Sequence, residues 1–172
     1  TLKQQGKVRF IGVTGFPVAL LKTMAEKHEL DVTLSYCHGN LLNNRMHNVL
    51  VPTVQEKEMG LLNASVTHMG LLTRQGGQTW HPASDEIKVA ARQAAEYCAS
   101  VDVSLAELAI QFAVAQLNVD VTVLGARTIK ELDRSIAVIE EPIAEELLTA
   151  VQARLKPAHN KSWPSGHEMY WE

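Results

Sequence analysis

Four short, mainly apolar segments alternate along the chain with longer segments in which apolar residues recur at helical spacing. The short segments predict β-strands, because loop-forming residues follow each of them. We expect strands at residues 8–13, 31–36, 60–65 and 121–124. We expect helices at residues 17–28, 42–57, 85–100, 105–117, 128–139 and 142–155, after a polar helix that ends at Gly6.

Strand and helix alternate as expected for parallel strands joined by crossover helices, so the predicted fold class is α/β. The loops that follow the strands then gather on one side of the sheet. Periodicity leaves two architectures open, a small open sheet and half of a barrel. The loop at residues 66–80 is long and contains Gly70, Gly76 and Gly77, and long loops at the ends of strands often carry function.

Two later helices are expected to begin with a capping box, in which two side chains three positions apart bond each other's backbone N–H groups. Ser104 and Glu107 have this spacing, as do Thr128 and Glu131. Pro17 suits a first helical turn, where its missing N–H has no partner to lose.

The composition is that of an ordinary globular chain, with 46% hydrophobic and 20% charged residues. A net charge of −3 gives no reason to expect binding to nucleic acid or to an anionic membrane.

No apolar run reaches the roughly 18 residues of a membrane span, and residues 1–5 lack the pattern of a secretion signal, so we expect a cytoplasmic protein. Cys37 and Cys98 lack the spacing of a zinc site, so we expect free thiols and no metal.

Several motifs occur in an order that is more specific than any of them alone. They are GKVRFIGVTG, SYCH, NAS followed by MGLLT, WHPAS, LGART and SWPSG. With these motifs the chain resembles the aldo-keto reductases, and most of all the sugar-oxidising members typified by L-galactose dehydrogenase and by the aldose and L-fucose dehydrogenases. The resemblance implies a (β/α)8 barrel, of which residues 1–172 form a partial domain with strands 5–8, their helices and the C-terminal extension.

Strands 1–4 of the barrel are then outside this chain, and with them the family's catalytic Asp, Tyr, Lys and His. No catalytic residue is therefore assigned here, and His38, His68 and His81 do not fill that role. A four-strand piece also has unpaired edges and an unfilled interior, so we expect it to need the missing half, from the same gene or from a second chain.

The same resemblance implies a site for a nicotinamide dinucleotide. Thr14 and Gly15, which follow the first predicted strand, would hold the nicotinamide carboxamide, and Thr33 on the next strand would assist. Without the family, Thr14 and Gly15 are more typical of a simple turn. Many members carry Gln at the position of Thr33, and Thr reaches less far.

The phosphates would lie further along the chain. Ser65 would bond the pyrophosphate, while the loop at Gly70 and Leu71 would turn backbone N–H groups toward the phosphates. A helix N-terminus after the fourth strand offers a further site for an anion. Its implied cofactor-binding residues are Gly125, Ala126, Arg127, Thr128, Glu131, Arg134 and Ser135.

This helix start favours NAD over NADP. Members that prefer NADP carry Lys or Arg at the positions of Gly125 and Glu131, because a 2′-phosphate needs cations, whereas Glu131 would repel one. Arg127 and Arg134 leave NADP open, since either could reach the adenosine end or be a solvated charge.

The implied reaction is hydride transfer between the nicotinamide and the anomeric carbon of a sugar, or another carbonyl substrate. Trp163 would contact the substrate, because an indole packs well on the C–H face of a sugar, or would instead plug the barrel rim. Two alternatives remain: a cofactor-binding regulatory subunit resembling the potassium-channel β subunits, and an inactive fragment.

Overall fold

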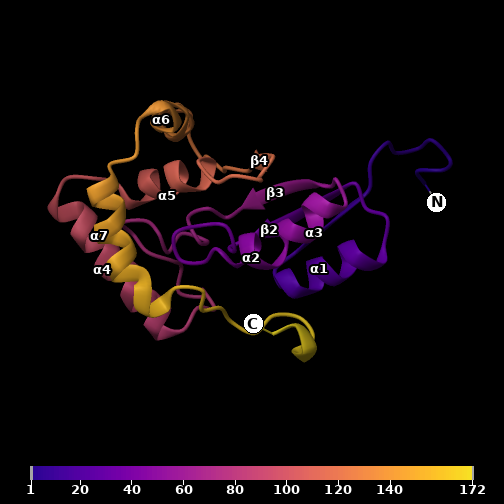
Figure 1. The fold of residues 1–172 in the computed structure, drawn as a ribbon. Helices are drawn as coiled ribbons and strands as arrows, with labels where there is room; N and C mark the ends of the chain where they lie inside the picture. Colours follow the sequence, from indigo (N-terminus) through magenta and orange to yellow (C-terminus); the bar gives the residue numbers. More distant parts are fainter. Residues whose placement is uncertain (1, 172) are drawn as a thin grey trace.

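The computed structural model describes residues 2–171 and contains a parallel sheet of four strands (Figure 1). The strands are β1 (Gly12–Gly15), β2 (Val32–Tyr36), β3 (Gly60–Ala64) and β4 (Val121–Thr122). Their spatial order is the same as their order in the chain. A parallel sheet whose order never reverses is singly wound, as in a (β/α)8 barrel, whereas a doubly wound sheet reverses at a switch point. The α/β class is confirmed, and the strand order favours half of a barrel over a small open sheet.

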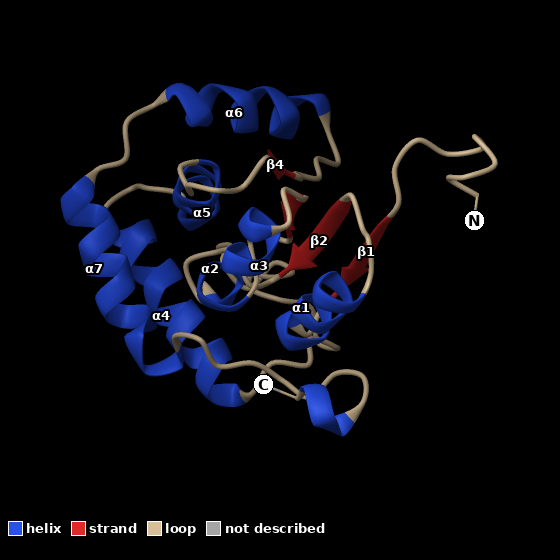
Figure 2. Ribbon diagram, turned by 45° about the vertical axis from the view of Figure 1, so that its right-hand side comes forward, coloured by secondary structure: helices blue, strands red, loops and turns tan. Residues whose placement is uncertain are grey.

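The helices lie around this sheet, with α4 and α7 packed against each other at one end and α1, α2 and α3 together beside β1 and β2 (Figure 2). The helices are α1 (Val18–Lys27), α2 (Arg45–Val49), α3 (Val51–Glu56), α4 (Asp85–Ser100), α5 (Leu105–Val114), α6 (Ile129–Glu140) and α7 (Glu145–Leu155), with 3-10 turns η1 (Lys156–Ala158) and η2 (Glu168–Tyr170).

The two faces of the sheet differ in burial. Side chains alternate along each strand, so Thr33 and Ser35 of β2, and Leu61 and Asn63 of β3, share one face and are buried. Leu61 belongs to the apolar cluster formed with α1, α2 and α3, so this face carries the helices. The opposite face, with Leu34 at its centre, is only half-buried or exposed. That open face corresponds to the interior of a barrel.

Two elements expected near the N-terminus are corrected. The first strand is Gly12–Gly15 instead of residues 8–13, because its register with β2 begins at Gly12 and Val32. Ile11, the residue before it, bonds Asp31 through its own N–H and carbonyl groups. Phe10 is consequently 65% exposed. The polar helix expected to end at Gly6 is a series of turns.

The helix expected at residues 42–57 is two short helices that begin at Arg45. The Asn40 side-chain oxygen accepts hydrogen bonds from the N–H groups of Leu42 and Asn43, and the Asn43 oxygen accepts from Arg45. Such side-chain bonds replace helical ones and hold residues 40–44 in turns.

Smaller corrections concern the other ends of elements. The expected third strand extends one residue beyond the observed β3, and the fourth contains only Val121–Thr122. α5 ends at Val114, α6 reaches Glu140 and α7 begins at Glu145. The helices at residues 17–28 and 85–100 are confirmed, the first within one residue at each end and the second at both ends.

No single helix among residues 2–171 is long and apolar enough to cross a membrane. The pair α4 and α5 passes on length and composition together, but the two helices are bent by 107°. Both helices bury apolar side chains in the same core, where Ala94 and Leu108 are 0% and 1% exposed. The apolar side chains of α4 and α5 therefore form part of the core of this chain.

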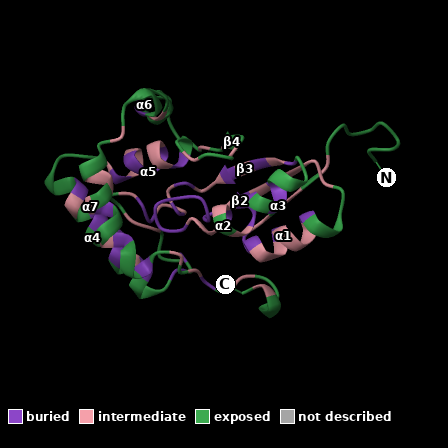
Figure 3. Cartoon of the chain, in the orientation of Figure 1, coloured by how far each residue is buried: buried purple, intermediate pink, exposed green. Residues whose placement is uncertain are grey.

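Helix α6 is mostly exposed, as its colour in Figure 3 shows, and it carries an exposed apolar stripe. Ile129, Leu132, Ile136 and Ile139 recur at helical spacing, with exposures of 79%, 48%, 55% and 39%. Only Val138 of this helix is buried. A stripe of this kind is typical of a helix that packs against another element.

Candidate functional site

A cleft with a volume of about 840 Å³ separates the glycine-rich loop after β3 from the N-terminal turns of α5 and α6. The loop contributes Gly70 and Thr73, and the α6 segment contributes Gly125, Thr128 and Ser135. The full lining also includes Thr67, Arg74, Gln75, Gly76, Gln78, Ser104, Ala106, Glu107, Ile110, Arg127, Lys130, Glu131 and Arg134. Two segments that are far apart in sequence therefore line one cavity.

A smaller hollow of about 300 Å³ adjoins this cleft and reaches the end of β3. It contains Ser65 and shares Thr67, Ile110, Gly125 and Ser135 with the larger cleft. The two together form a trough from Ser65 at the strand end to the first turns of α6. The expected cofactor residues Ser65, Gly70, Gly125, Arg127, Thr128, Glu131, Arg134 and Ser135 all line it.

The backbone of the loop turns sharply at three successive residues. His68, Met69 and Gly70 have successive positive φ angles of 53°, 54° and 93°. The turn is held from within, because the N–H groups of Gly70 and Leu72 donate to the Thr67 carbonyl at 3.1 and 3.0 Å. The Thr73 hydroxyl donates a hydrogen bond to the Gly70 carbonyl at 2.7 Å and so closes the turn.

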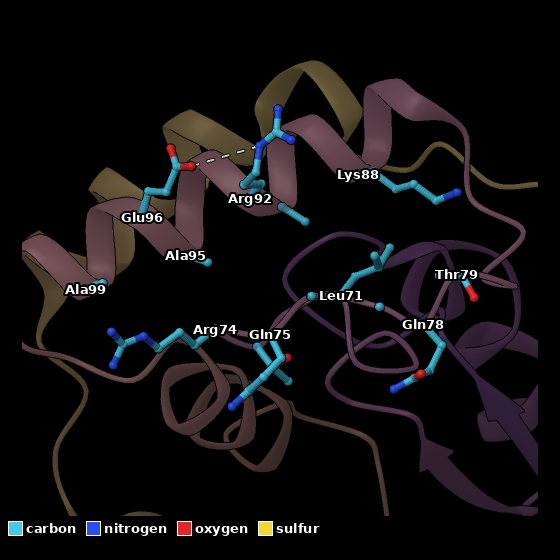
Figure 4. Close-up of a pocket in the computed structure, with 14 residues that line it drawn as sticks. Leu71, Arg74, Gln75, Gln78, Thr79, Lys88, Arg92, Ala95, Glu96 and Ala99 are labelled. Carbon is cyan, nitrogen blue, oxygen red and sulfur yellow. Dashed lines mark ion pairs between the residues drawn. The ribbon is translucent and has the colours of Figure 1, made fainter.

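Leu71 lies on the other side of this loop. Its side chain is 4% exposed and lines a separate pocket of about 530 Å³ against α4, together with Lys88 and Arg92 (Figure 4). The dashed line in that view is the Arg92–Glu96 ion pair along α4. Leu71 therefore anchors the loop through its side chain, and its backbone N–H donates to the His68 carbonyl at 3.2 Å. The role expected for Leu71 at the phosphates is therefore corrected. Ala126 is exposed but is not among the residues that line the trough.

The N-terminus of α6 is closed by its own acidic residue. Thr128 caps the helix by accepting a hydrogen bond from the Glu131 N–H at 3.1 Å. The Glu131 carboxylate accepts from the backbone N–H of Arg127 at 2.8 Å, one residue earlier than in the expected capping box. This N–H of Arg127, more than any other contact, lowers the pKa of Glu131. Glu131 therefore stays ionised at neutral pH and adds a negative charge to the cleft.

Both arginines of this segment have carboxylate partners. Arg127 pairs with Glu131 at 3.2 Å, while its side chain is 91% exposed. Arg134 pairs with Glu107 of α5 and with Glu141. Hydrogen bonds from Arg134 to Glu107, and then to Glu141, raise the pKa of the guanidinium. Glu107 was expected only as a capping residue. Its place in the cleft depends on its contact with Arg134, which is 27 positions away in sequence and leaves no local pattern.

The register between β1 and β2 places Thr14 and Thr33 on opposite faces of the sheet. Thr14 is exposed on the open face, beside Leu34 in the strand register. Thr33 is aligned with Val13 and is fully buried toward the helices, where its hydroxyl has no hydrogen-bond partner. The expected role of Thr33 at the carboxamide is therefore corrected, because a two-residue strand period turns it away from the face that carries Thr14.

Trp163 is 8% exposed and lies in a cluster of rings. It stacks on Phe16 with ring centroids 4.6 Å apart and makes edge contacts with His68 and His81 at 5.4 and 5.2 Å. This enclosure favours the packing role over the substrate contact.

The histidines of this cluster are held neutral. Burial is the main cause that lowers the pKa of His68 to about 3, and burial also lowers that of His81. His81 Nδ1 accepts from the Ala83 N–H, so its Nε2 donates to the His68 carbonyl. Among residues 2–171 there is no group of three His, Cys, Asp or Glu side chains that could hold a metal ion, and both cysteines are buried free thiols.

Comparisons with known proteins agree with this geometry. The model of the aldo/keto reductase family matches residues 1–156. The chain is 36% identical to L-galactose dehydrogenase of Arabidopsis thaliana, over 96% of this chain and 54% of that protein. It is 30% identical to D-arabinose 1-dehydrogenase of Saccharomyces cerevisiae, over 96% of this chain and 56% of that protein. The chain thus spans about half the length of the curated relatives that it matches.

The holo form of aldo-keto reductase AKR11C1 from Bacillus halodurans superimposes with a TM-score of 0.70 at 21% identity, over 99% of this chain and 56% of that chain. Its apo form matches with the same TM-score and identity, over 57% of that chain. The expected fold, half of a (β/α)8 barrel, is confirmed. With a family model that matches residues 1–156, the chain belongs to the aldo/keto reductase family.

Proposed function

We propose that the protein containing this chain is an NAD(P)-dependent oxidoreductase that oxidises a sugar at its anomeric carbon. The observation that carries the proposal is the trough between the loop at residues 66–80 and the start of α6. This chain supplies the part that holds the cofactor. The group that moves the proton comes from the remaining strands of the barrel.

The trough fits a dinucleotide in size and in chemistry. Its larger part is about 840 Å³, within the range of about 300–1,000 Å³ that is typical of small-molecule sites. Arg74 and Lys130 line the same cleft and supply positive charge for a pyrophosphate, because Glu131 already bonds the Arg127 N–H at the start of α6. Gly125 has no atom within 4 Å of the place where a Cβ would be, so its backbone is open to a ligand. A pyrophosphate between Ser65 and α6 meets these groups.

The nicotinamide, when bound, supplies the hydride chemistry, and residues of this chain orient it. Thr14 is exposed at the end of β1 on the open face, where its hydroxyl is free to bond a carboxamide. Gly15 follows it, where a Cβ would meet only the flexible Leu21 side chain, at 3.3 Å. We assign the carboxamide to Thr14 and Gly15.

We propose NAD as the preferred cofactor. Glu131 is ionised, lies in the cleft and holds Arg127. A 2′-phosphate there meets a carboxylate, whereas a ribose hydroxyl can donate a hydrogen bond to it. The names of the two relatives, L-galactose dehydrogenase and D-arabinose 1-dehydrogenase, support an aldose as substrate.

We propose further that a second set of strands and helices completes the barrel, from the same gene or from another chain. The half-open face of the sheet and the apolar stripe Ile129, Leu132, Ile136 and Ile139 support this, because a closed barrel buries both. Such a partner brings the catalytic residues to the edge of the sheet where Thr14 lies.

The test is a dehydrogenase assay with the complete protein that contains this sequence. We expect reduction of NAD⁺ in the presence of L-galactose, L-fucose or D-arabinose, followed by the absorbance of the reduced nicotinamide. Thr14→Val should weaken turnover and cofactor binding together. Failure to bind either cofactor in calorimetry would overturn the proposal, and binding without turnover of any aldose would overturn its substrate class.

A further inference from the structure

The guanidinium of Arg134 lies in an acidic clamp between α5 and the end of α6. Its Nε and Nη2 donate hydrogen bonds to the two carboxylate oxygens of Glu107 at 2.9 and 2.6 Å. Its Nη1 donates to Glu141 at 2.7 Å. A bidentate pair fixes the plane of a guanidinium as well as its position. All three nitrogen atoms of Arg134 therefore already have a carboxylate acceptor.

The clamp is part of the same cleft as Glu131. Glu107, Glu131 and Arg134 all line it, and Glu131 and Arg134 are three positions apart on α6, so they share a helix face. Glu107 is the less exposed partner, at 27% for its side chain against 47% for Arg134. It projects from α5, whose start is capped by Ser104 and packed into the core through Leu105 and Leu108. The carboxylate that holds Arg134 thus stands on a fixed support.

The charges around the clamp matter for a cofactor that carries one more phosphate. A 2′-phosphate adds about two negative charges and needs cations that are free to bond it. Arg127 is engaged by Glu131, and Arg134 by two acids. Arg134 would otherwise be a cation able to offset Glu131 on the same helix face.

We propose that Glu107 is a specificity-determining residue, which keeps Arg134 from bonding a 2′-phosphate and so strengthens the preference for NAD. This inference rests on the proposed function, since it concerns the adenosine end of the same cofactor trough. It differs from the effect of Glu131, which acts by repulsion, because Glu107 acts by holding a cation that could otherwise attract the phosphate.

The test is the ratio of the dissociation constants for NADP⁺ and NAD⁺, measured by calorimetry with the complete protein. Glu107→Gln keeps the shape of the side chain and removes the charge that holds Nε and Nη2 of Arg134, while Nη1 stays bonded to Glu141. We expect the ratio to shift roughly tenfold toward NADP⁺, as a new charge-assisted hydrogen bond implies. Glu145→Gln on α7 removes one exposed negative charge outside the cleft and should leave the ratio unchanged. An unchanged ratio in Glu107→Gln would overturn the inference.

The variant Arg134→Met tests the inference independently, through the same ratio of dissociation constants. In the presence of Glu107 we expect it to leave the ratio within about twofold, and in the double variant with Glu107→Gln it should abolish the tenfold gain. A selective loss of NADP⁺ affinity in Arg134→Met alone would mean that Arg134 already binds the 2′-phosphate, which would overturn the inference. If the unchanged protein binds neither cofactor, the proposed function fails and the inference with it; if it binds NAD⁺ and only the ratios disagree, the inference fails alone.

Discussion

The Glu131 carboxylate accepts a hydrogen bond from the backbone N–H of Arg127 at 2.8 Å, while the side chain of Arg127 pairs with the same carboxylate at 3.2 Å. One acidic side chain thereby holds the loop before α6 and occupies its nearest cation. It also places a negative charge where the anion site of a helix N-terminus would otherwise be open. The preference between the two cofactors therefore depends on Glu131.

Glu131→Arg should improve the binding of NADP⁺ relative to NAD⁺ by about tenfold or more, because a repulsive charge is replaced by one able to bond a 2′-phosphate. Titration calorimetry of the complete protein with both cofactors measures the ratio. Asp133→Arg makes the same change of charge on the same helix, at an exposed position that does not line the cleft, and should have little effect. Equal shifts in both variants would show that only the overall charge matters.

Thr14→Val should weaken NADH binding by roughly 2- to 10-fold, which corresponds to one hydrogen bond of about 0.5–1.5 kcal/mol. Fluorescence of the reduced nicotinamide follows the titration. The matched control is Thr33→Val, since Thr33 is on the next strand but is buried toward the helices with an unpartnered hydroxyl. We expect this control to leave cofactor binding unchanged and not to lower stability. Loss of binding in Thr33→Val instead of Thr14→Val would reverse our assignment.

Ile136→Asn should destabilise the complete protein by about 2 kcal/mol or more, although Ile136 is 55% exposed in this chain. The reason is that the stripe on α6 is proposed to pack against the missing part of the barrel. Denaturant unfolding measures the change. Asp133→Asn, also exposed and on the same helix, should be nearly neutral. A neutral effect of Ile136→Asn would show that this face stays in water.

Stability should fall as the pH drops below about 6.5, because burial lowers the pKa of His68 from 6.5 to about 3. In that window the unfolded chain binds a proton that the folded chain excludes, so acid favours unfolding. Denaturant midpoints at pH about 7 and about 5 test this, and His68→Gln should flatten the dependence. His28→Gln, at an exposed position, should not flatten it. A midpoint independent of pH in the unchanged protein would contradict the prediction.

The sequence alone determined the α/β class, the helix at Asp85–Ser100 and the family, because these depend on local periodicity, on the Ser84 cap and on motifs within short segments. Through the resemblance it also predicted some of the residues that line the trough, among them Ser65, Gly70 and Glu131.

Tertiary structure decided what depends on pairing between distant segments. Strand register set the true start of β1 and turned Thr33 away from Thr14. Packing enclosed Trp163 among Phe16, His68 and His81. The approach of α5 to α6 brought Glu107 to Arg134 across 27 positions of sequence. Periodicity records which residues are apolar but not which segments meet, so these contacts appear only once the chain is folded.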